Sequence, residues 1–310
     1  MLIAGLVTLS YSGQAAIYEV APEHRNPVGS ENVLTGEGFG SSSSIIESLQ
    51  QSQSDDKKTD YLNALDLLKN NKLAEARTQI TGLIKKYPKN SEFYNLQALL
   101  ELLSKNIPDA QQNYLKAIEM NPKNILAHLG LSKLFLDTGE LEKSKESANR
   151  ALAINDKVVN GYLLLADVAL KQNSLKDVEK ILILGLEKVK GTIGTELELV
   201  KNLAKFYAIQ KQPEKALALA EDITKKNPEN KEALSILAGA QIINTKKNEA
   251  EQTLRQIITL NKQEVDHRLL LARLLNEQPG KEQEILKLLD EAYAIAPKNP
   301  QVLVFKTAYL

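Results

Sequence analysis

The chain has 310 residues, of which 43% are hydrophobic and 25% charged, and its 39 basic residues balance its 39 acidic ones. This length and composition are ordinary for one or two folded domains or one repeat array, and the charge balance removes the basic surface expected of a general nucleic-acid-binding protein. The sequence contains no cysteine, which excludes a disulfide, a thiolate zinc site and a cysteine nucleophile.

Residues 1–16 predict a secretory signal. Met1 to Tyr18 carry no charge, and Leu2 to Leu9 form a short apolar run, although no Lys or Arg precedes it. Gly13-Gln14-Ala15 places small side chains where a signal peptidase reads them, so we expect cleavage near Ala15 or Ala16 and a periplasmic or secreted protein. The alternatives are a retained N-terminal membrane anchor, although the run is shorter than the roughly twenty residues of a spanning helix, and a disordered tail.

Residues 17–56 differ from the rest of the chain in composition. They contain two prolines, several glycines, the serine run 41–44 and a stretch of Gln, Ser and Asp. Such a segment cannot bury enough apolar surface to offset the entropy lost on ordering, so we expect a disordered linker.

An internal repeat begins after the linker. The prolines at 88 and 122 lie 34 residues apart, and Pro228 and Pro297 follow at near-multiples of that spacing. Each is followed by Lys or Glu and then by Asn. With each proline counted as position 32 of a repeat, small residues recur at positions 8 and 20, where two helices of a hairpin must approach closely. They are Ala64, Ala98, Ser132, Ala166, Ala204, Ala238 and Ala272 at position 8, and Ala76, Ala110, Ala216 and Ala250 at position 20.

This pattern resembles the tetratricopeptide repeat (TPR) family. The resemblance implies an all-α fold, a right-handed α-solenoid of about seven helix–turn–helix repeats plus a short C-terminal helix. The predicted repeats are 57–90, 91–124, 125–158, 159–192, 197–230, 231–264 and 265–299, so that repeats 1–4 cover 57–192 and repeats 5–7 cover 197–299.

Three segments depart from the regular pattern. The fourth repeat has Val178 and Gly185 at sites usually occupied by alanine, and residues 193–196 are an insert that we place in the connection after it. This degenerate repeat and its glycine-rich insert indicate a bend or a sub-domain boundary. Residues 300–310 begin another helix and then stop, so we expect a partial capping helix there.

No arrangement of residues predicts catalysis, a metal or a cofactor. The three histidines, His24, His128 and His267, show no metal-ligand spacing, and no glycine-rich phosphate loop follows a strand. His128 occupies position 4 of its repeat, where the family places a large packing residue, so a core histidine is the better interpretation. We therefore predict a protein that is not an enzyme, with no catalytic residues and no small-molecule substrate.

The resemblance also implies a binding surface. In this family the first helix of each repeat lines a concave groove, with positions 2, 5, 9, 12 and 13 turned toward a ligand. Carried onto this sequence at positions 5 and 9, the candidate partner-binding residues are Tyr61, Asn95, Leu99, Leu129, Lys133, Leu163, Asp167, Lys201, Lys205, Leu269 and Arg273. Apolar and charged side chains alternate in this set, which suits a peptide with hydrophobic anchors and a few charges.

The predicted function is a scaffold or adaptor that binds protein or peptide partners, with no nucleic acid among them. The resemblance extends to repeat regions of exported bacterial proteins in exopolysaccharide, pilus and cell-envelope assembly, and so implies association with envelope complexes. Two alternatives stay open: a non-catalytic regulatory or targeting subunit of an enzyme complex, and a cytosolic TPR scaffold. The sequence does not determine the oligomeric state.

Overall fold

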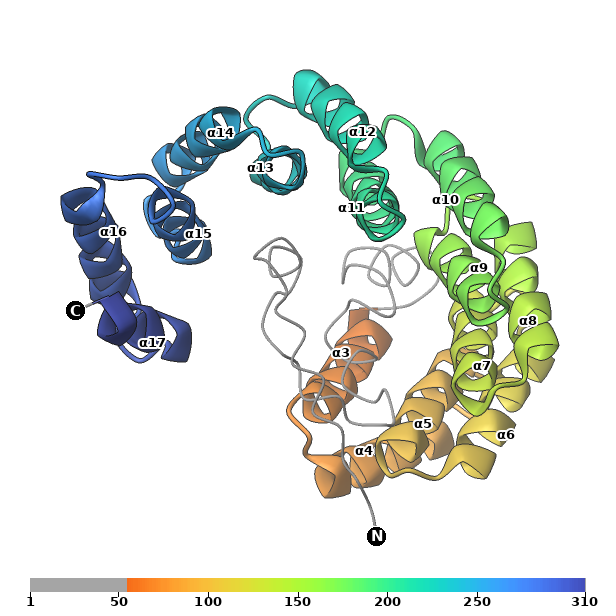
Figure 1. The fold of residues 1–310 in the computed structure, drawn as a ribbon. Coiled ribbons are helices and arrows are strands. Elements are labelled where there is room, and N and C mark those ends of the chain that lie inside the picture. The colour runs from red at the N-terminus through yellow and green to blue at the C-terminus, as the bar shows by residue number, and fades with distance from the viewer. Residues whose placement is uncertain (1–54, 310) are drawn as a thin grey trace, which may run out of the picture. The chain divides into compact units, whose positions relative to one another are not determined.

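The computed structural model describes residues 55–309, and every regular element within that range is an α-helix (Figure 1). The predicted signal and almost all of the predicted linker lie outside these residues. The first fourteen helices form seven pairs, each joined by a short connection, as expected for antiparallel helical hairpins. They are α3 (Asp55–Lys69) with α4 (Leu73–Lys86), α5 (Ser91–Leu103) with α6 (Ile107–Met120), α7 (Ile125–Thr138) with α8 (Leu141–Ile154), α9 (Val159–Lys171) with α10 (Leu175–Val189), α11 (Ile193–Ile209) with α12 (Pro213–Lys226), α13 (Lys231–Ile243) with α14 (Lys247–Leu260), and α15 (Asp266–Leu275) with α16 (Glu282–Ile295).

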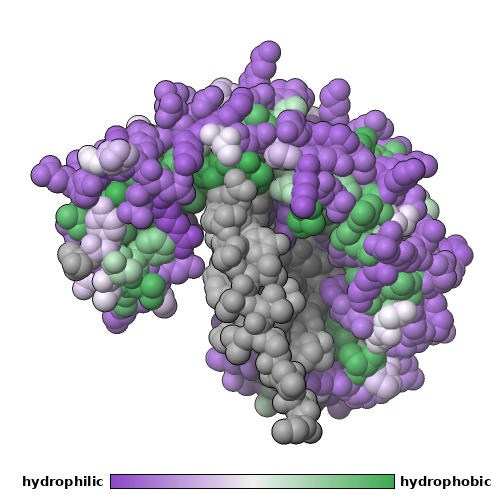
Figure 2. All heavy atoms as spheres, viewed as in Figure 1, coloured by the Kyte–Doolittle hydropathy of each residue, from purple (hydrophilic) through white to green (hydrophobic). Residues whose placement is uncertain are grey.

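The predicted all-α solenoid is confirmed. Helix α17 (Pro300–Tyr309) follows the seven pairs and packs on α16 as the expected short terminal helix, with Val302 fully buried. The described chain divides into an N-terminal body, residues 55–199, and a C-terminal body, residues 200–309, with the boundary inside α11. In the view of Figure 2, hydrophilic side chains cover most of the surface of each body, with smaller hydrophobic areas between them.

Small residues hold the two helices of each pair together. All eleven predicted small positions are buried, at 4% exposure or less. In the third repeat, Ser132 and Ser144 replace alanines at positions 8 and 20. The Ser144 hydroxyl donates to the Ser132 carbonyl at 2.8 Å, so the close contact leaves no hydroxyl unpaired. In the fourth repeat, Val178 fills the alanine site, and Gly185 makes room for Tyr162, whose ring lies 2.7 Å from where a Cβ would stand.

Each connection between the first and second helix of a repeat contains one residue in the left-handed backbone region. Its φ lies between 55° and 83° in all seven repeats. Glycine and asparagine tolerate this conformation, whereas lysine and threonine do so at a cost. The residues are Asn71, Lys105, Gly139, Asn173, Lys211, Thr245 and Gly280. The shared backbone angle shows that the repeats keep one turn geometry even where the side chain does not favour it.

A second recurring contact joins neighbouring repeats. At position 4, the side chains of Tyr94, His128 and Tyr162 each contact the carbonyl of the residue at position 32 of the preceding repeat, at 3.4, 3.0 and 2.8 Å respectively. His128 is therefore a buried histidine with a backbone partner, as the sequence predicts, and takes the structural role of the tyrosines in the flanking repeats.

The structure corrects the placement of residues 193–196. These residues form the first turn of α11, not a connection. Gly191, with φ of 92°, lies just after α10, and its N–H donates to the Glu196 carboxylate. Glu196 and Leu197 are buried, so the extra turn is anchored by packing. Because four residues are close to one helical turn, the insertion rotates the apolar face by only about 40°.

Candidate functional site

The predicted partner-binding residues fall into two groups. Five are buried within the chain, four of them at position 5 and Leu99 at position 9. In the N-terminal body the first helices of successive repeats pack against one another, α3 on α5, α5 on α7 and α7 on α9. These five are Tyr61, Asn95, Leu99, Leu129 and Leu269. Their burial leaves them unable to contact a partner in the structure described.

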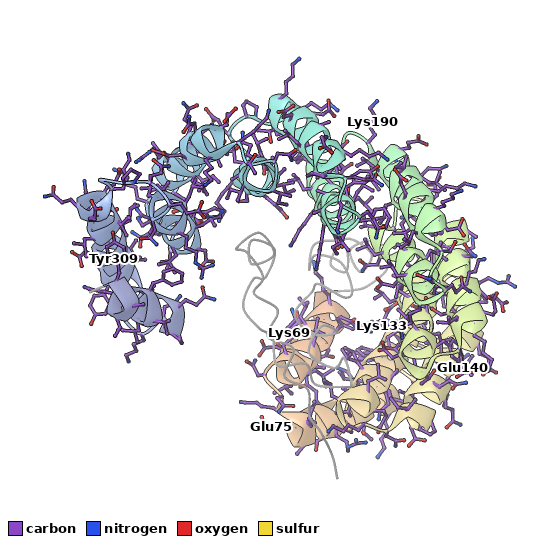
Figure 3. The ribbon with its side chains drawn as sticks, in the orientation of Figure 1. Lys69, Glu75, Lys133, Glu140, Lys190 and Tyr309 are labelled. Carbon is purple, nitrogen blue, oxygen red and sulfur yellow. The ribbon has the colours of Figure 1, made fainter. Side chains whose placement is uncertain are left out.

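The other six predicted residues are at least partly exposed. They are Lys133, Leu163, Asp167, Lys201, Lys205 and Arg273. Lys133, labelled in Figure 3, forms an ion pair with Asp137 one turn further along α7, at 2.5 Å. Partner binding by these six residues stays a prediction.

A cavity of about 550 Å³ opens at the C-terminal end of the C-terminal body. Its wall combines side chains from α13, α15, α16 and α17, most of them apolar. Leu270 comes from α15, Asn276 directly follows that helix, Leu289 comes from α16, and Phe305 and Tyr309 come from α17. Tyr309 is labelled near the end of α17 in Figure 3. A concave, mainly apolar wall with a few polar groups is the usual character of a ligand site.

Arg273 stands at the edge of this cavity. Its guanidinium lies 4.1 Å from the centre of the Phe305 ring, within range of a cation–π contact. Burial lowers the pKa of this guanidinium from its usual range. Glu277, also in the cavity wall, is paired with Lys247 at 2.5 Å. Within residues 200–309, Arg273 forms no ion pair with a carboxylate. Its guanidinium is therefore available to pair with a carboxylate of a ligand.

Sequence reasoning identified Arg273 but missed the rest of this cavity. Ile242 and Asn276 occupy position 12 of their repeats, and Glu277 occupies position 13. Both are positions that the family pattern turns toward a ligand. Carrying those positions onto the sequence, in addition to 5 and 9, identifies these three residues. Phe305 and Tyr309 lie in the partial terminal helix, and the repeat pattern alone does not show which helices this segment packs against.

A serine, a histidine and a glutamate lie in hydrogen-bonded order in the C-terminal body. Ser235 Oγ is 2.8 Å from His267 Nε2, and His267 Nδ1 is 2.8 Å from the Glu264 carboxylate. This order resembles a hydrolytic triad. However, Ser235 lies inside α13, where backbone N–H groups are used within the helix, and its hydroxyl is 2.7 Å from the Lys231 carbonyl. The Ser235 hydroxyl thus already has a carbonyl partner in its own helix, and we interpret the trio as a tie between α13 and the start of α15.

No group of three or more His, Asp or Glu side chains in residues 55–309 is arranged to hold a metal ion. Among the helices of this range, none is long and apolar enough to cross a membrane.

The sequence matches tetratricopeptide repeat models. One model matches residues 61–125 and 104–158, and a second matches residues 207–274. These matches together span more than half of the chain and both compact bodies.

The chain is similar in sequence to one curated relative and in fold to two solved structures. The chain is 25% identical over 245 residues to the human protein O-mannosyl-transferase TMTC3, covering 76% of this chain but only 26% of the relative. It is similar to PilW, a type IV pilus biogenesis factor, with TM-score 0.51 and 16% identity over 69% of this chain and 97% of PilW. It is also similar to a tetratricopeptide repeat protein from Parabacteroides merdae, with TM-score 0.51 and 13% identity over 81% of this chain and 98% of that one.

Proposed function

Because the chain belongs to the tetratricopeptide repeat family, whose members generally mediate protein–protein interactions, we propose that it is a non-catalytic adaptor that binds a polypeptide partner in the cavity between α15 and α17. The cavity is the observation that carries this proposal. Its apolar wall can hold one or two hydrophobic side chains of a partner, and the Arg273 guanidinium on its edge can pair with a neighbouring carboxylate.

The preformed cavity also explains how such a partner is bound without a large entropic cost. Its wall is built on four helices whose other faces belong to one core, which includes Leu271, Leu289 and Val302. A partner therefore orders its own segment but not the site, which reduces the free-energy cost of association.

We further propose that the protein is exported and acts in bacterial cell-envelope, exopolysaccharide or pilus assembly. Support comes from the apolar run 2–9, the small residues before Ala16 and the similarity in fold to PilW. Mass spectrometry of the N-terminus of the protein isolated from its native cell tests export. A mature start near Ala16 supports it, and an intact Met1 in the cytosol contradicts it and favours the cytosolic scaffold.

Selection of random 12-residue peptides against the full chain tests the cavity. Selected peptides are expected to share an apolar anchor, and Ala308→Trp, which places an indole in the cavity wall, is expected to abolish their binding. Ala218→Trp on α12 is the matched control, since both alanines are exposed. Equal binding by the two variants, with unchanged circular-dichroism melts, would contradict the proposed site.

A further inference from the structure

The last helix of the C-terminal body, α17, has an outer face without charge. Leu303 and Val304 on this face are 43% and 66% exposed. The one charged side chain of the helix, Lys306, lies against α16, where its ammonium is 2.8 Å from the Asp290 carboxylate. A repeat array normally ends in a helix whose outer face is polar, but the exposed residues of α17 are Pro300, Gln301, Leu303, Val304, Thr307 and Ala308.

The corresponding face is buried in the preceding first helices. Leu303 occupies position 4 of an eighth repeat, once the extra residue of the seventh repeat is counted, and Thr307 occupies position 8. Position 4 is at most 8% exposed in the second to seventh repeats, and position 8 is at most 4% exposed in all seven. In each of these repeats a second helix packs on the first. No second helix follows α17 within the described residues, so its face has room for one further helix.

The relief of this face makes it complementary to itself. Its two large apolar side chains, Leu303 and Val304, are followed one turn later by two smaller ones, Thr307 and Ala308. When two copies of α17 pack antiparallel about a twofold axis, Leu303 of each copy faces Thr307 of the other, and Val304 faces Ala308. Large side chains then pack against small ones, and the same surface serves both copies, as a twofold contact requires.

The first helix of the array does not suit a head-to-tail contact with α17. The exposed residues of α3 include Asp56, Asn63 and Asp66. Packing this stripe against the apolar face of a second copy would bury two carboxylates without a partner, which is energetically unfavourable. The outer face of α17 carries no charge, so a twofold contact between two such faces opposes no like charges. Among contacts between copies, the pairing of α17 with α17 is therefore favoured.

We propose that α17 is the interface of a homodimer, in which the two terminal helices pack antiparallel about a twofold axis. One helix of ten residues per copy is a small interface, so the expected dissociation constant is micromolar or weaker. Leu303 and Val304 do not line the cavity of the proposed function, which contacts α17 at Phe305, Ala308 and Tyr309. Dimerisation and peptide binding can therefore be tested with different variants.

Sedimentation equilibrium of the full chain, from about 1 µM to about 500 µM, measures self-association. The natural chain is expected to form a dimer as its concentration rises, and Val304→Glu to weaken the dimer by roughly tenfold or more, because each interface then holds two unpaired carboxylates. Ile209→Glu on α11 is the matched control, since Ile209 is 67% exposed, and should leave the dimer unchanged. A natural chain that stays monomeric throughout, or equal dissociation constants for the natural chain and Val304→Glu, would overturn the proposal.

Disulfide formation tests the antiparallel register. The natural chain has no cysteine, so an introduced thiol is the only one in its chain. In an equimolar mixture of Leu303→Cys and Thr307→Cys, the disulfide between the two variants is expected to form fastest, because these positions face each other across the twofold axis. Two copies of residue 303 lie more than one helical turn apart along the pair. Like disulfides that form as fast as the mixed one, from variants whose circular-dichroism melts match the natural chain, would contradict this pairing.

Discussion

Single residues in this chain hold conformations and charges that its repeated geometry imposes on them. Thr245 is the clearest case, because a β-branched residue occupies the left-handed backbone position of the sixth repeat, with φ of 58°. In the third and seventh repeats a glycine occupies that position. A non-glycine residue in this conformation costs about 1–2 kcal/mol. Glycine avoids that cost, but it loses more conformational entropy on folding, which cancels part of the gain.

We therefore expect Thr245→Gly to stabilise the protein by about 0.5–1 kcal/mol. The midpoint of urea unfolding, followed by circular dichroism, measures the change. Thr78→Gly, at an exposed position inside α4, is the control and should destabilise by a few tenths of a kcal/mol, roughly the difference in helix propensity between the two residues. Destabilisation by Thr245→Gly would mean that the threonine side chain contributes more than its backbone conformation costs.

Glu264 carries a charge that the fold stabilises. Burial alone would raise the pKa of this carboxyl, but Lys231 at 2.6 Å and His267 at 2.8 Å hold it below its ordinary value near 4.5. The folded protein thus binds this proton less readily than the unfolded chain. The resulting stability is present above the unfolded pKa and is lost as pH falls through the folded pKa.

Glu264→Gln should cost about 1–3 kcal/mol at pH 7 and less at pH 3, because the natural chain loses the stability of its charged carboxyl as pH falls. Urea unfolding at both pH values, with hydrogen exchange in α13 and α15 as the local readout, measures the difference. A deficit that is the same at both pH values would show that the charge of Glu264 contributes nothing.

At the scale of helices, the sequence predicted the repeats well because the contacts that define them are local. Close approach of two helices requires small residues at fixed positions, so Ala76, Ala110 and their equivalents mark each pair in the sequence alone. The insert at 193–196 was misplaced because its helical state depends on Gly191, Glu196 and burial of Leu197, which no periodic pattern reports. The buried groove candidates, such as Asn95, were chosen by repeat position, which does not show how neighbouring first helices cover one another.

Ala110→Leu tests the close contact of α5 with α6. Ala110 is fully buried, so the added atoms must push the helices apart, at a cost of typically 1–3 kcal/mol or more. Because each repeat is stabilised mainly by its neighbours, we expect the adjoining repeats to lose protection from hydrogen exchange as well. Ala153→Leu on the exposed side of α8 is the control. An unchanged melt of the Ala110 variant would contradict the packing account.

At the scale of the whole molecule, the C-terminal body presents an apolar cavity with the Arg273 guanidinium beside it. Position 9 of the family pattern identified Arg273, and positions 12 and 13 identify three more residues of the wall. Phe305 and Tyr309 could not be predicted from the repeat, because they lie on α17, beyond the last full repeat. The family pattern therefore predicts the helices and their order, whereas the cavity as a whole appears only in the tertiary structure.

Charge reversal separates binding from folding. Lys133, Lys205 and Arg273 are partly or fully exposed, so changing all three to Glu should leave the melt nearly unchanged while abolishing capture of the partner in a pull-down. Undiminished capture would remove these residues from the binding surface.

The most direct measurement is site-specific photo-cross-linking in the native cell. A benzoylphenylalanine in place of Tyr309 keeps an aromatic ring in the cavity wall, and one at 218 lies on the exposed side of α12. We predict one discrete adduct from position 309 and none from position 218. The cross-linked protein, once purified, should bind the natural chain saturably and the Ala308→Trp variant much more weakly. The same adducts from both positions, or equal binding by the natural chain and the variant, would contradict an adaptor that holds its partner in this cavity.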